Sequence, residues 1–308
     1  MVIIMRKKGL IFLSLIAYVT LIIGLVKIKV YKAEQVDSAF SKIQLNEQID
    51  AKAAVVLDAK TLAILYEKNA NVKMLPASIT KILTCITALE TYKLDDYVYI
   101  TEEMVNTVGS KIYLMPGDYV KVENLLLGLM LNSGNDAAKS LALHLSGKEE
   151  DYIALMNKLA QRIGMKNSVF NNPSGLDDDT CNYTTAFDMA ILTAYALNNN
   201  DFKRIFSTKA KVVEQENHYL YLHHKHKLVQ SCDYVIGGKT GYTKKAGRTL
   251  VTTYKIDDRE VIVVTLDAHN DWQIHQMFYQ KCKNQTIEIL SVIVPKPFSK
   301  RLRGEKDD

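Results

Sequence analysis

The stretch TLVTTYKIDDREVIVVTL, residues 249–266, decides the architecture, because it holds two apolar segments joined by one short turn. Thr249 to Lys255 and Val261 to Leu266 have the β-branched residues that favour strands. Asp257-Asp258 lies between them where a hairpin turn is expected. With the apolar segment Tyr234 to Lys239 just upstream, three strands are predicted late in the chain.

A second hairpin is predicted early in the chain, from Ala53 to Leu57 and from Leu62 to Tyr66, with Asp58 to Thr61 as its turn. Between the two strand-rich ends, apolar residues recur at helical spacing. The predicted helices are Ser78 to Tyr92, Val122 to Leu145 with an Asn-Ser-Gly-Asn break, Asp151 to Ile163, Thr185 to Leu197, and a last one including Trp272 to Cys282. The predicted fold class is α+β: an antiparallel sheet of about five strands from both chain ends, flanked by helices, with an inserted helical subdomain.

The composition is that of a globular protein, with 48% hydrophobic and 24% charged residues among 308. The net charge of +5 is mild and spread out, which argues against a nucleic-acid partner. Cys85, Cys181, Cys232 and Cys282 stand far apart without a C-x-x-C motif, so they fit neither a zinc site nor a dense disulfide framework. Mostly free, buried thiols are expected, and one bridge stays open.

The N-terminus predicts attachment to a membrane. Residues 9–26 form an apolar run without charge, preceded by Arg6, Lys7 and Lys8. The run is close to the length that spans a bilayer, and no clear A-x-A site follows it, so we expect an uncleaved signal anchor rather than a cleaved signal. The expected organisation is a cytoplasmic N-terminus 1–8, a transmembrane anchor 9–26, a linker 27–45, a catalytic domain 46–284 and a basic tail 285–308.

Three short motifs carry the chemistry. Ser78-Ile79-Thr80-Lys81 is S-x-x-K at the start of a predicted helix, Ser133-Gly134-Asn135 lies at a helix break, and Lys239-Thr240-Gly241 follows a strand. Each motif alone is common by chance. Together, in this order and at separations of about 50 and 100 residues, they indicate a serine acyl-transfer site.

The spacing of the first motif explains its chemistry. Residues three apart on a helix share a face, so the Lys81 amine can reach the Ser78 hydroxyl. A serine is a poor nucleophile until a base takes its proton. Partial burial and a nearby cation such as Lys239 would lower the pKa of Lys81 enough for it to be that base.

The other two motifs are expected to handle the substrate. Ser133 can relay a proton toward the departing amine, and Asn135 can bind a substrate amide. The strand edge of the third motif can take an extended peptide beside it. Lys239 and Thr240 would then hold the terminal carboxylate of the substrate.

Over roughly residues 46–284 the chain resembles the low-molecular-weight penicillin-binding proteins, the serine-type D-alanyl-D-alanine carboxypeptidases of the penicillin-binding protein 5 kind. The matching segments are residues 76–81, 131–138, 172–178 and 237–243. The resemblance implies a β-lactamase/transpeptidase-like fold and removal of the terminal D-alanine from peptidoglycan stem peptides in cell-wall synthesis. It also implies inhibition by β-lactams, and we expect no cofactor and no metal.

The resemblance assigns roles to single residues. It implies Ser78 as the acyl-enzyme nucleophile, Lys81 as the base and Ser133 as a further catalytic group. It implies substrate binding by Asn135, Lys239, Thr240, Gly241 and Tyr242, with the backbone N–H groups of Ser78 and Tyr242 as the oxyanion hole. Family members commonly carry a β-rich second domain and a C-terminal anchor. Here we expect an N-terminal anchor instead, with the catalytic domain on the extracytoplasmic side of the cell membrane.

Three alternatives remain at this stage. A β-lactamase would carry a Glu on a loop after the second motif, whereas Met165 to Thr185 contains none. A membrane-bound β-lactam sensor would need a cytoplasmic output module, whereas only residues 1–8 precede the apolar run. A DD-endopeptidase that cuts cross-links shares the chemistry, and the sequence separates it poorly from a carboxypeptidase.

Three polar stretches have a second interpretation. His223-His224-Lys225-His226 is interpreted as a solvated edge rather than a metal site. Asp177-Asp178-Asp179 is interpreted as a turn that positions the rim of the site rather than a cation loop. Arg248 is either a carboxylate-binding group or a surface cation on a strand.

Overall fold

The computed structural model describes residues 42–45, 48–177, 181–215 and 218–293. Gln44–Lys281 forms one compact unit; of the second unit, Met1–Ile43 with Cys282–Asp308, only 42–43 and 282–293 are described. The predicted N-terminus 1–8 and anchor 9–26 therefore lie outside the described residues, as do most of the predicted linker and tail. None of the described helices is both long enough and apolar enough to cross a bilayer.

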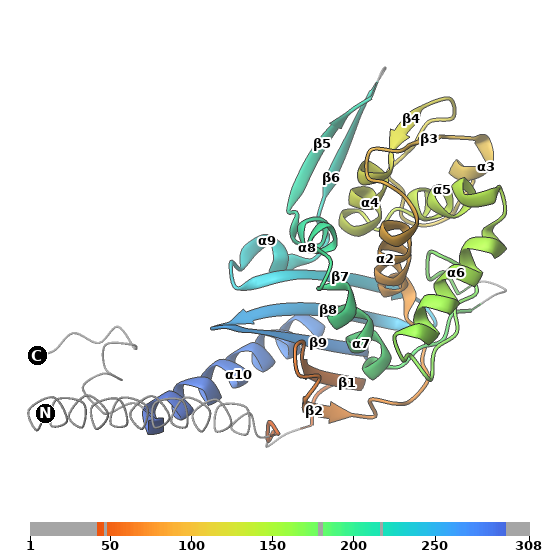
Figure 1. Ribbon diagram of the computed structural model, residues 1–308. Helices are drawn as coiled ribbons and strands as arrows, with labels where there is room; N and C mark the ends of the chain where they lie inside the picture. The colour runs from red at the N-terminus through yellow and green to blue at the C-terminus, as the bar shows by residue number, and fades with distance from the viewer. Residues whose placement is uncertain (1–41, 46–47, 178–180, 216–217, 294–308) are drawn as a thin grey trace, which may run out of the picture. The chain divides into compact units, whose positions relative to one another are not determined.

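The unit Gln44–Lys281 is built on a five-stranded antiparallel sheet in the order β2-β1-β9-β8-β7 (Figure 1). The strands are β1 (Ala51–Asp58), β2 (Ile64–Lys68), β7 (Val235–Thr243), β8 (Gly247–Ile256) and β9 (Arg259–Ala268). The early hairpin β1–β2 joins the late hairpin β8–β9 through the pairing of β1 with β9. This confirms the predicted fold class, and it leaves β7 at an edge of the sheet.

The predicted helices are confirmed to within a few residues. They are α2 (Lys81–Thr91), α4 (Val122–Leu131), α5 (Asn135–Ser146), α6 (Glu149–Arg162) and α7 (Ala186–Ala196). The sequence did not predict the shorter elements β3 (Tyr97–Tyr99), α3 (Glu102–Val105), β4 (Tyr119–Lys121), α8 (Asn200–Ser207), β5 (Ala210–Glu214), β6 (Tyr219–His223) and α9 (Lys227–Ser231). All but α8 span five residues or fewer, which is too short for a hydrophobic period to be recognised.

The first predicted helix begins differently from the expectation. Residues Ala77–Thr80 form a 3₁₀ turn, η1, and the α-helix starts only at Lys81. Ala77 has a φ of 49°, a left-handed conformation that side-chain-bearing residues rarely adopt. The hydroxyl of Thr249 on β8 donates to the carbonyl of Pro76 at 2.8 Å, which ties this turn to the sheet. Ser78 therefore lies in a tight turn held against the sheet.

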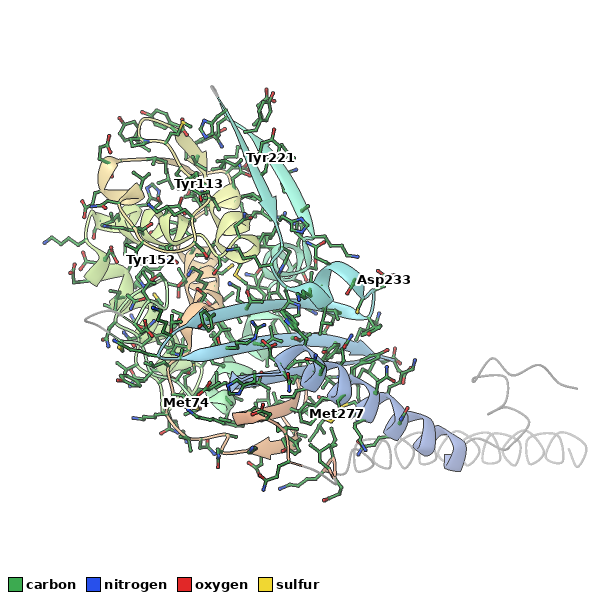
Figure 2. The ribbon with its side chains drawn as sticks, turned by 180° about the vertical axis from the view of Figure 1, so that it is seen from behind. Met74, Tyr113, Tyr152, Tyr221, Asp233 and Met277 are labelled. Atoms are coloured by element: carbon green, nitrogen blue, oxygen red, sulfur yellow. The ribbon has the colours of Figure 1, made fainter. Side chains whose placement is uncertain are left out.

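The sheet has helices on both faces. Alternate residues of β9, Ile262, Val264 and Leu266, join the hydrophobic core beneath the inserted helices. Helix α10 spans Asp271–Ile293, and its part up to Lys281 covers the opposite face, where Met277 marks it in Figure 2. It starts one residue before the predicted helix and continues beyond the predicted end at Cys282.

The expected solvated edge is correct for His223 and Lys225, which are exposed, and wrong for His224 and His226, which are buried. His224 and His226 are only 2% and 0% exposed. The hydroxyl of Thr252 lies 2.9 Å from His226 Nε2 and 2.7 Å from His275 Nδ1, and the hydroxyl of Thr265 lies 3.0 Å from His275 Nε2. Burial lowers the pKa of His275 to about 3 and that of His226 well below its usual value. Polar side chains were expected to face solvent, but here threonine hydroxyls supply their hydrogen bonds inside the fold.

These histidines predict a loss of stability in acid. The unfolded chain binds a proton on each histidine near its ordinary pKa of about 6.5, whereas the folded chain refuses one on His275 until about pH 3. The contribution of His275 is therefore complete above pH 6.5 and falls by about 1.4 kcal/mol per pH unit below it. His275→Gln should flatten the dependence of the unfolding free energy on pH between 6.5 and 3, measured by urea denaturation. His269→Gln, at an 81% exposed side chain, is the control; equal slopes for wild type and His275→Gln would contradict the prediction.

Candidate active site

A buried lysine ammonium lies at the centre of the site. Lys81 is 0% exposed. Its Nζ donates to Ser78 Oγ at 3.0 Å, to Asn135 Oδ1 at 2.8 Å and to the carbonyl of Ser174 at 2.6 Å. An ammonium has three protons, so these acceptors satisfy it completely. The structure thereby brings the first and second motifs together.

The surroundings of Lys81 prepare it to act as a base. Burial lowers its pKa to about 7; the charge of Lys225 lowers the pKa further, and Asp136 opposes the shift. Near neutral pH a large fraction of Lys81 is therefore the free amine. A free amine within hydrogen-bond distance of a serine hydroxyl can accept its proton.

The third motif reaches the second through Lys239. Lys239 is 1% exposed, and its Nζ donates to Ser133 Oγ at 2.9 Å and to the carbonyl of Thr240 at 2.8 Å. Burial and then the charge of Lys81 hold the pKa of Lys239 well below its usual value. An anion placed in the cleft would oppose both effects and favour the charged form. The geometry thus suits Lys239 to a ligand that brings a carboxylate.

Asn135 is part of the site, but its amide is already engaged. Its Oδ1 accepts from Lys81, and its Nδ2 donates to the carbonyl of Val108 at 2.6 Å. Asn135 is 4% exposed. Without substrate, Asn135 orients the Lys81 amine. A hydrogen bond from Asn135 to a substrate amide would replace its bond to Lys81 or its bond to Val108.

The edge strand β7 passes very close to Ser78. A Cβ added to Gly241 would lie 2.9 Å from the backbone nitrogen of Ser78 and 2.3 Å from the hydroxyl of Thr249, so glycine is required there. Tyr242, the next residue, is 66% exposed beside the cleft. The backbone of Ser78 therefore adjoins the strand that carries Tyr242. Two backbone N–H groups must lie close together in this way to stabilise one oxyanion.

A loop from Asn172 to Asp177 supports the other side of the site. Gly175 has a φ of 84°, and a Cβ there would come within 1.9 Å of the carbonyl of Ala77. The carboxylate of Asp177 accepts from the hydroxyl of Thr243 at 2.5 Å, at the end of β7. The predicted rim turn thus adjoins η1 at Gly175 and binds β7 through Asp177. Asp178 and Asp179 lie outside the described residues.

Ser78, Ser133 and the residues Thr240, Gly241 and Tyr242 of β7 open onto one cavity of about 620 Å³. Its walls come from all three motifs, from the segment around Lys225 and from the start of α10. The lining residues are Ser78, Ser110, Ser133, Lys225, Lys227, Thr240, Gly241, Tyr242, Arg248, His269, Asn270, Asp271, Trp272 and Gln273.

The sequence matches the peptidase S11 family model, described as D-alanyl-D-alanine carboxypeptidase, over residues 39–270. This chain belongs to the D-alanyl-D-alanine carboxypeptidase family. It is 34% identical to the D-alanyl-D-alanine carboxypeptidase DacF of Bacillus subtilis, over 71% of this chain and 58% of DacF. It is 31% identical to DacC of Escherichia coli, over 76% of this chain and 61% of DacC. The chain therefore spans less than two thirds of the length of these two relatives.

Solved structures of the family have the same fold. A D-alanyl-D-alanine carboxypeptidase of Mycobacterium tuberculosis superposes with a TM-score of 0.70 at 28% identity, over 73% of this chain and 85% of that protein. A mutant of the Streptomyces K15 DD-transpeptidase superposes with a TM-score of 0.70 at 26% identity, over 80% of this chain and all of that one. The predicted β-lactamase/transpeptidase-like architecture is thereby confirmed.

Three residues of this family member's site were missed by sequence reasoning: Ser110, Asp136 and Lys225. Lys225 Nζ donates to Ser110 Oγ at 2.9 Å, and both residues line the cavity. The buried carboxylate of Asp136 accepts from the backbone N–H groups of Ile112, Tyr113, Leu114 and Ala137. Asp136 directly follows Asn135, but an acid in the first turn of a helix usually signals only a favourable dipole contact. The other two residues are recognisable only once the fold places them.

Arg248 was interpreted either as a carboxylate-binding group or as a surface cation, and the structure has features of both. Its guanidinium is 43% exposed and lines the cavity, yet it is held by the buried carboxylate of Asp271 at 3.0 and 3.1 Å. Such a bidentate pair fixes the orientation of an arginine. Arg248 is therefore a positioned cation at the cavity wall rather than a freely solvated one.

The pKa of Lys81 predicts the pH dependence of acylation in this family member. The second-order rate of acylation by penicillin should rise with pH, with a midpoint near 7, because deprotonated Lys81 is the reactive form. Lys225→Gln removes a positive charge that disfavours protonated Lys81, so its profile should shift to higher pH. Lys211→Gln, at an exposed lysine on β5, should leave the profile unchanged. A flat profile across pH 6 to 8 would contradict this assignment.

Proposed function

We propose that this chain is a serine-type D-Ala-D-Ala carboxypeptidase that removes the terminal D-alanine from peptidoglycan stem peptides through an acyl-enzyme on Ser78. One observation carries the proposal: the Lys81 amine lies 3.0 Å from Ser78 Oγ at the base of a cavity lined by Ser133 and the edge of β7. Family membership supports the same chemistry. Lys81 serves as the base, and Ser133 and Lys239 act at the leaving group.

Acylation begins when Lys81 takes the proton of Ser78. The Ser78 oxygen then bonds to the carbonyl carbon of the penultimate D-alanine, and the carbonyl becomes an oxyanion. The backbone N–H groups of Ser78 and Tyr242 stabilise this charge where it develops. The positive N-terminal end of the α2 helix, which begins just after Ser78, also stabilises the oxyanion.

The departing amine is protonated through Ser133. Its hydroxyl accepts from Lys239 at 2.9 Å. Ser133 can therefore pass its own proton to the amine and take a replacement proton from Lys239. The C–N bond breaks, and D-alanine leaves with its carboxylate released from Lys239 and Thr240. Water then attacks the Ser78 ester and gives a proton to Lys239, Lys81 returns its proton to the Ser78 oxygen, and the shortened peptide leaves as a carboxylate.

The substrate is proposed to lie along β7. An edge strand has unpaired backbone groups, so an extended peptide can add beside it as a further strand. Thr240, Gly241 and Tyr242 border the cavity at this edge. The terminal carboxylate meets Lys239 and Thr240, whose charge and hydroxyl select a free chain end.

Penicillin should trap the same serine. Ser78 opens the β-lactam ring and forms an ester, but the leaving amine stays tethered and blocks the approach of water. The segment from Met165 to Thr185 has no Glu to activate water from another side. The penicilloyl-enzyme should therefore persist for minutes or longer, while the peptide turns over.

The test compares intact mass after mixing with penicillin and D-alanine release from a synthetic pentapeptide. Wild type should keep the adduct and release D-alanine; Ser78→Ala should do neither while remaining folded by circular dichroism. Ser168→Ala, at a serine outside the cavity, is the control and should behave as wild type. Rapid return to the free mass without D-alanine release would indicate a β-lactamase, and a lasting adduct without peptide turnover would indicate a sensor.

The same proposal includes a single-pass anchor at residues 9–26, with the catalytic unit on the extracytoplasmic side of the cell membrane. It rests on the uncharged apolar run, which is close to the length that spans a bilayer, and on the proposed substrate, which is a cell-wall peptide. The anchor would hold the cavity within reach of the wall without contributing a catalytic group.

Membrane attachment is tested with the full chain. After cell lysis, fluorescent-penicillin label should sediment with membranes and resist alkaline carbonate washing. Replacing Leu15 and Leu21 by Lys should release the labelled protein into the supernatant, because charges inside an apolar span cost about 2.5–3.5 kcal/mol each. Label that stays in the membrane fraction of this variant would refute the anchor.

A further inference from the structure

Two small sheets lie at the end of the unit that is far from β2 (Figure 1). One is the pair β3–β4 and the other is the pair β5–β6, and each buries one face in the core. Val98 and Val120 are buried in the first sheet, and Val213, Leu220 and Leu222 in the second. Because side chains alternate along a strand, the residues between them face outward. Each sheet therefore has an outer face that the core does not use.

The outer faces carry tyrosines, where an antiparallel sheet usually presents polar or charged residues. Tyr97, Tyr99 and Tyr119 project from the first sheet, and Tyr219 and Tyr221 from the second; Figure 2 labels Tyr221. These five side chains, the tyrosine surface, are between 52% and 72% exposed. A cluster of exposed large aromatic side chains marks a binding surface more often than a surface without function.

Contacts among the side chains of the tyrosine surface hold its rings in place. The ring centroids of Tyr99 and Tyr119 lie 5.1 Å apart, and those of Tyr219 and Tyr221 lie 6.4 Å apart. The hydroxyl of Tyr219 donates to Glu214 Oε1 at 3.4 Å. A side chain that is already ordered loses little conformational freedom when a ligand binds. The rings are therefore prepared to receive a ligand.

The two sheets meet at Asp118 and His218. His218 Nε2 lies 3.4 Å from Asp118 Oδ2. Asp118 directly precedes Tyr119, and His218 directly precedes Tyr219. Because consecutive Cα atoms are only about 3.8 Å apart, these two tyrosines start from neighbouring points of the backbone. The tyrosines of the two sheets therefore lie beside each other.

Strand β6 leads from the tyrosine surface to the catalytic cavity. Its outward side chains are Tyr219, Tyr221 and His223, and the alternation continues to Lys225, which lines the cavity. The backbone N–H of His223 donates to Asn132 Oδ1 at 2.9 Å, which holds this end of the strand beside the second motif. Four residues of extended chain span about 13 Å. Tyr221 is therefore about 13 Å along the strand from the cavity wall at Lys225.

The charge and shape of the tyrosine surface favour an uncharged ligand. Among the described residues of the outer faces, the charged ones are Lys121 and Glu214, and Lys121 is paired with Asp95 at 2.8 Å. An anionic lipid or another polyanion would need an excess of cations, which these faces lack. Tyrosines offer flat apolar faces edged by hydroxyls. A sugar ring has the complementary shape, with a face of C–H groups and a rim of hydroxyls.

The proposed substrate brings sugars to this distance from the cavity. A stem peptide is joined at its N-terminal end to a glycan strand, and in the proposed function its terminal carboxylate meets Lys239 and Thr240. Five extended residues span at most about 18 Å. The glycan strand that carries a bound pentapeptide therefore lies within reach of Tyr221.

We infer that the tyrosine surface binds the glycan strand of peptidoglycan, with uncharged N-acetylated sugar rings stacked on the tyrosines. The inference rests on the proposed function for the identity of the polymer, and it adds no chemical step. Binding the strand at a second point raises the local concentration of its stem peptides at Ser78. The enzyme would then favour peptides on a polymer over free peptides.

Binding is measured by fluorescence anisotropy with the detergent-solubilised full chain. The probe is a labelled hexamer of β-1,4-linked N-acetylglucosamine, which carries no peptide and no charge. Wild type should bind it. Tyr119→Ala combined with Tyr221→Ala should raise Kd at least about fivefold, because one ring is lost from each sheet. Tyr183→Ala, at an exposed tyrosine outside the tyrosine surface, is the control and should bind as wild type. Circular dichroism checks that both variants are folded.

Turnover gives a second measurement on the double variant. Its D-alanine release from a soluble pentapeptide should change by less than about twofold, because the catalytic groups are untouched. Its kcat/KM on pentapeptides that are attached to glycan strands should fall at least about fivefold. Equal slowing on both substrates overturns the inference, because the tyrosines would then act on the peptide itself.

The binding outcomes separate the inference from its rivals. No hexamer binding by wild type, or equal binding by wild type and the double variant, overturns it. If the double variant keeps hexamer binding but loses self-association or binding to phosphatidylcholine vesicles, the surface serves a second copy or a membrane, and the inference is overturned. Hexamer binding by wild type without D-alanine release from either substrate refutes the proposed function and leaves the sugar site standing.

Discussion

The site depends on hiding a lysine ammonium from water. Taking such a group out of water costs several kcal/mol unless hydrogen bonds replace its hydration. Lys81 regains them from Ser78, from Asn135, 54 residues further along, and from Ser174, 93 residues further along. The α2 helix, the α5 helix and the 172–177 loop must therefore meet at one point. The same desolvation that makes this point costly moves the pKa of Lys81 into the range where it can act as a base.

Both serines of the site sit beside strained or unusual backbone. Ala77 precedes Ser78 with a φ of 49°, and Ser133 itself has a φ of 62°. Such conformations cost of order 1–3 kcal/mol and persist only where surrounding contacts enforce them. Here the bond from Thr249 to Pro76 restrains the first turn, and the N–H groups of Gly134 and Asn135, just after Ser133, donate to the carbonyls of Gly128 and Ser110. The hydroxyls are therefore positioned before any substrate arrives.

Periodicity and motif spacing predicted the parts of this molecule that are local. The long strands and helices each bury a repeating face, and S-x-x-K works through a contact between residues three apart. The partnership of Lys225 with Ser110 joins residues 115 apart, so no local pattern reveals it. Polarity also misled: His226 looked solvated, yet it is buried because Thr252 and a backbone N–H satisfy its ring. The 3₁₀ turn at Ser78 escaped prediction because the sheet, rather than the turn's own residues, imposes it.

The open edge of β7 has a consequence for the solution behaviour of the protein. A strand that leaves its backbone unpaired for a peptide offers the same groups to a second copy of itself, which is how sheets associate edge to edge. Two copies meeting along this edge would bring Lys225 and Lys227 of each toward those of the other. Repulsion between these cations disfavours self-association, and the same positive charges attract anionic ligands. The cations around the cleft thus oppose edge-to-edge pairing of two copies at β7.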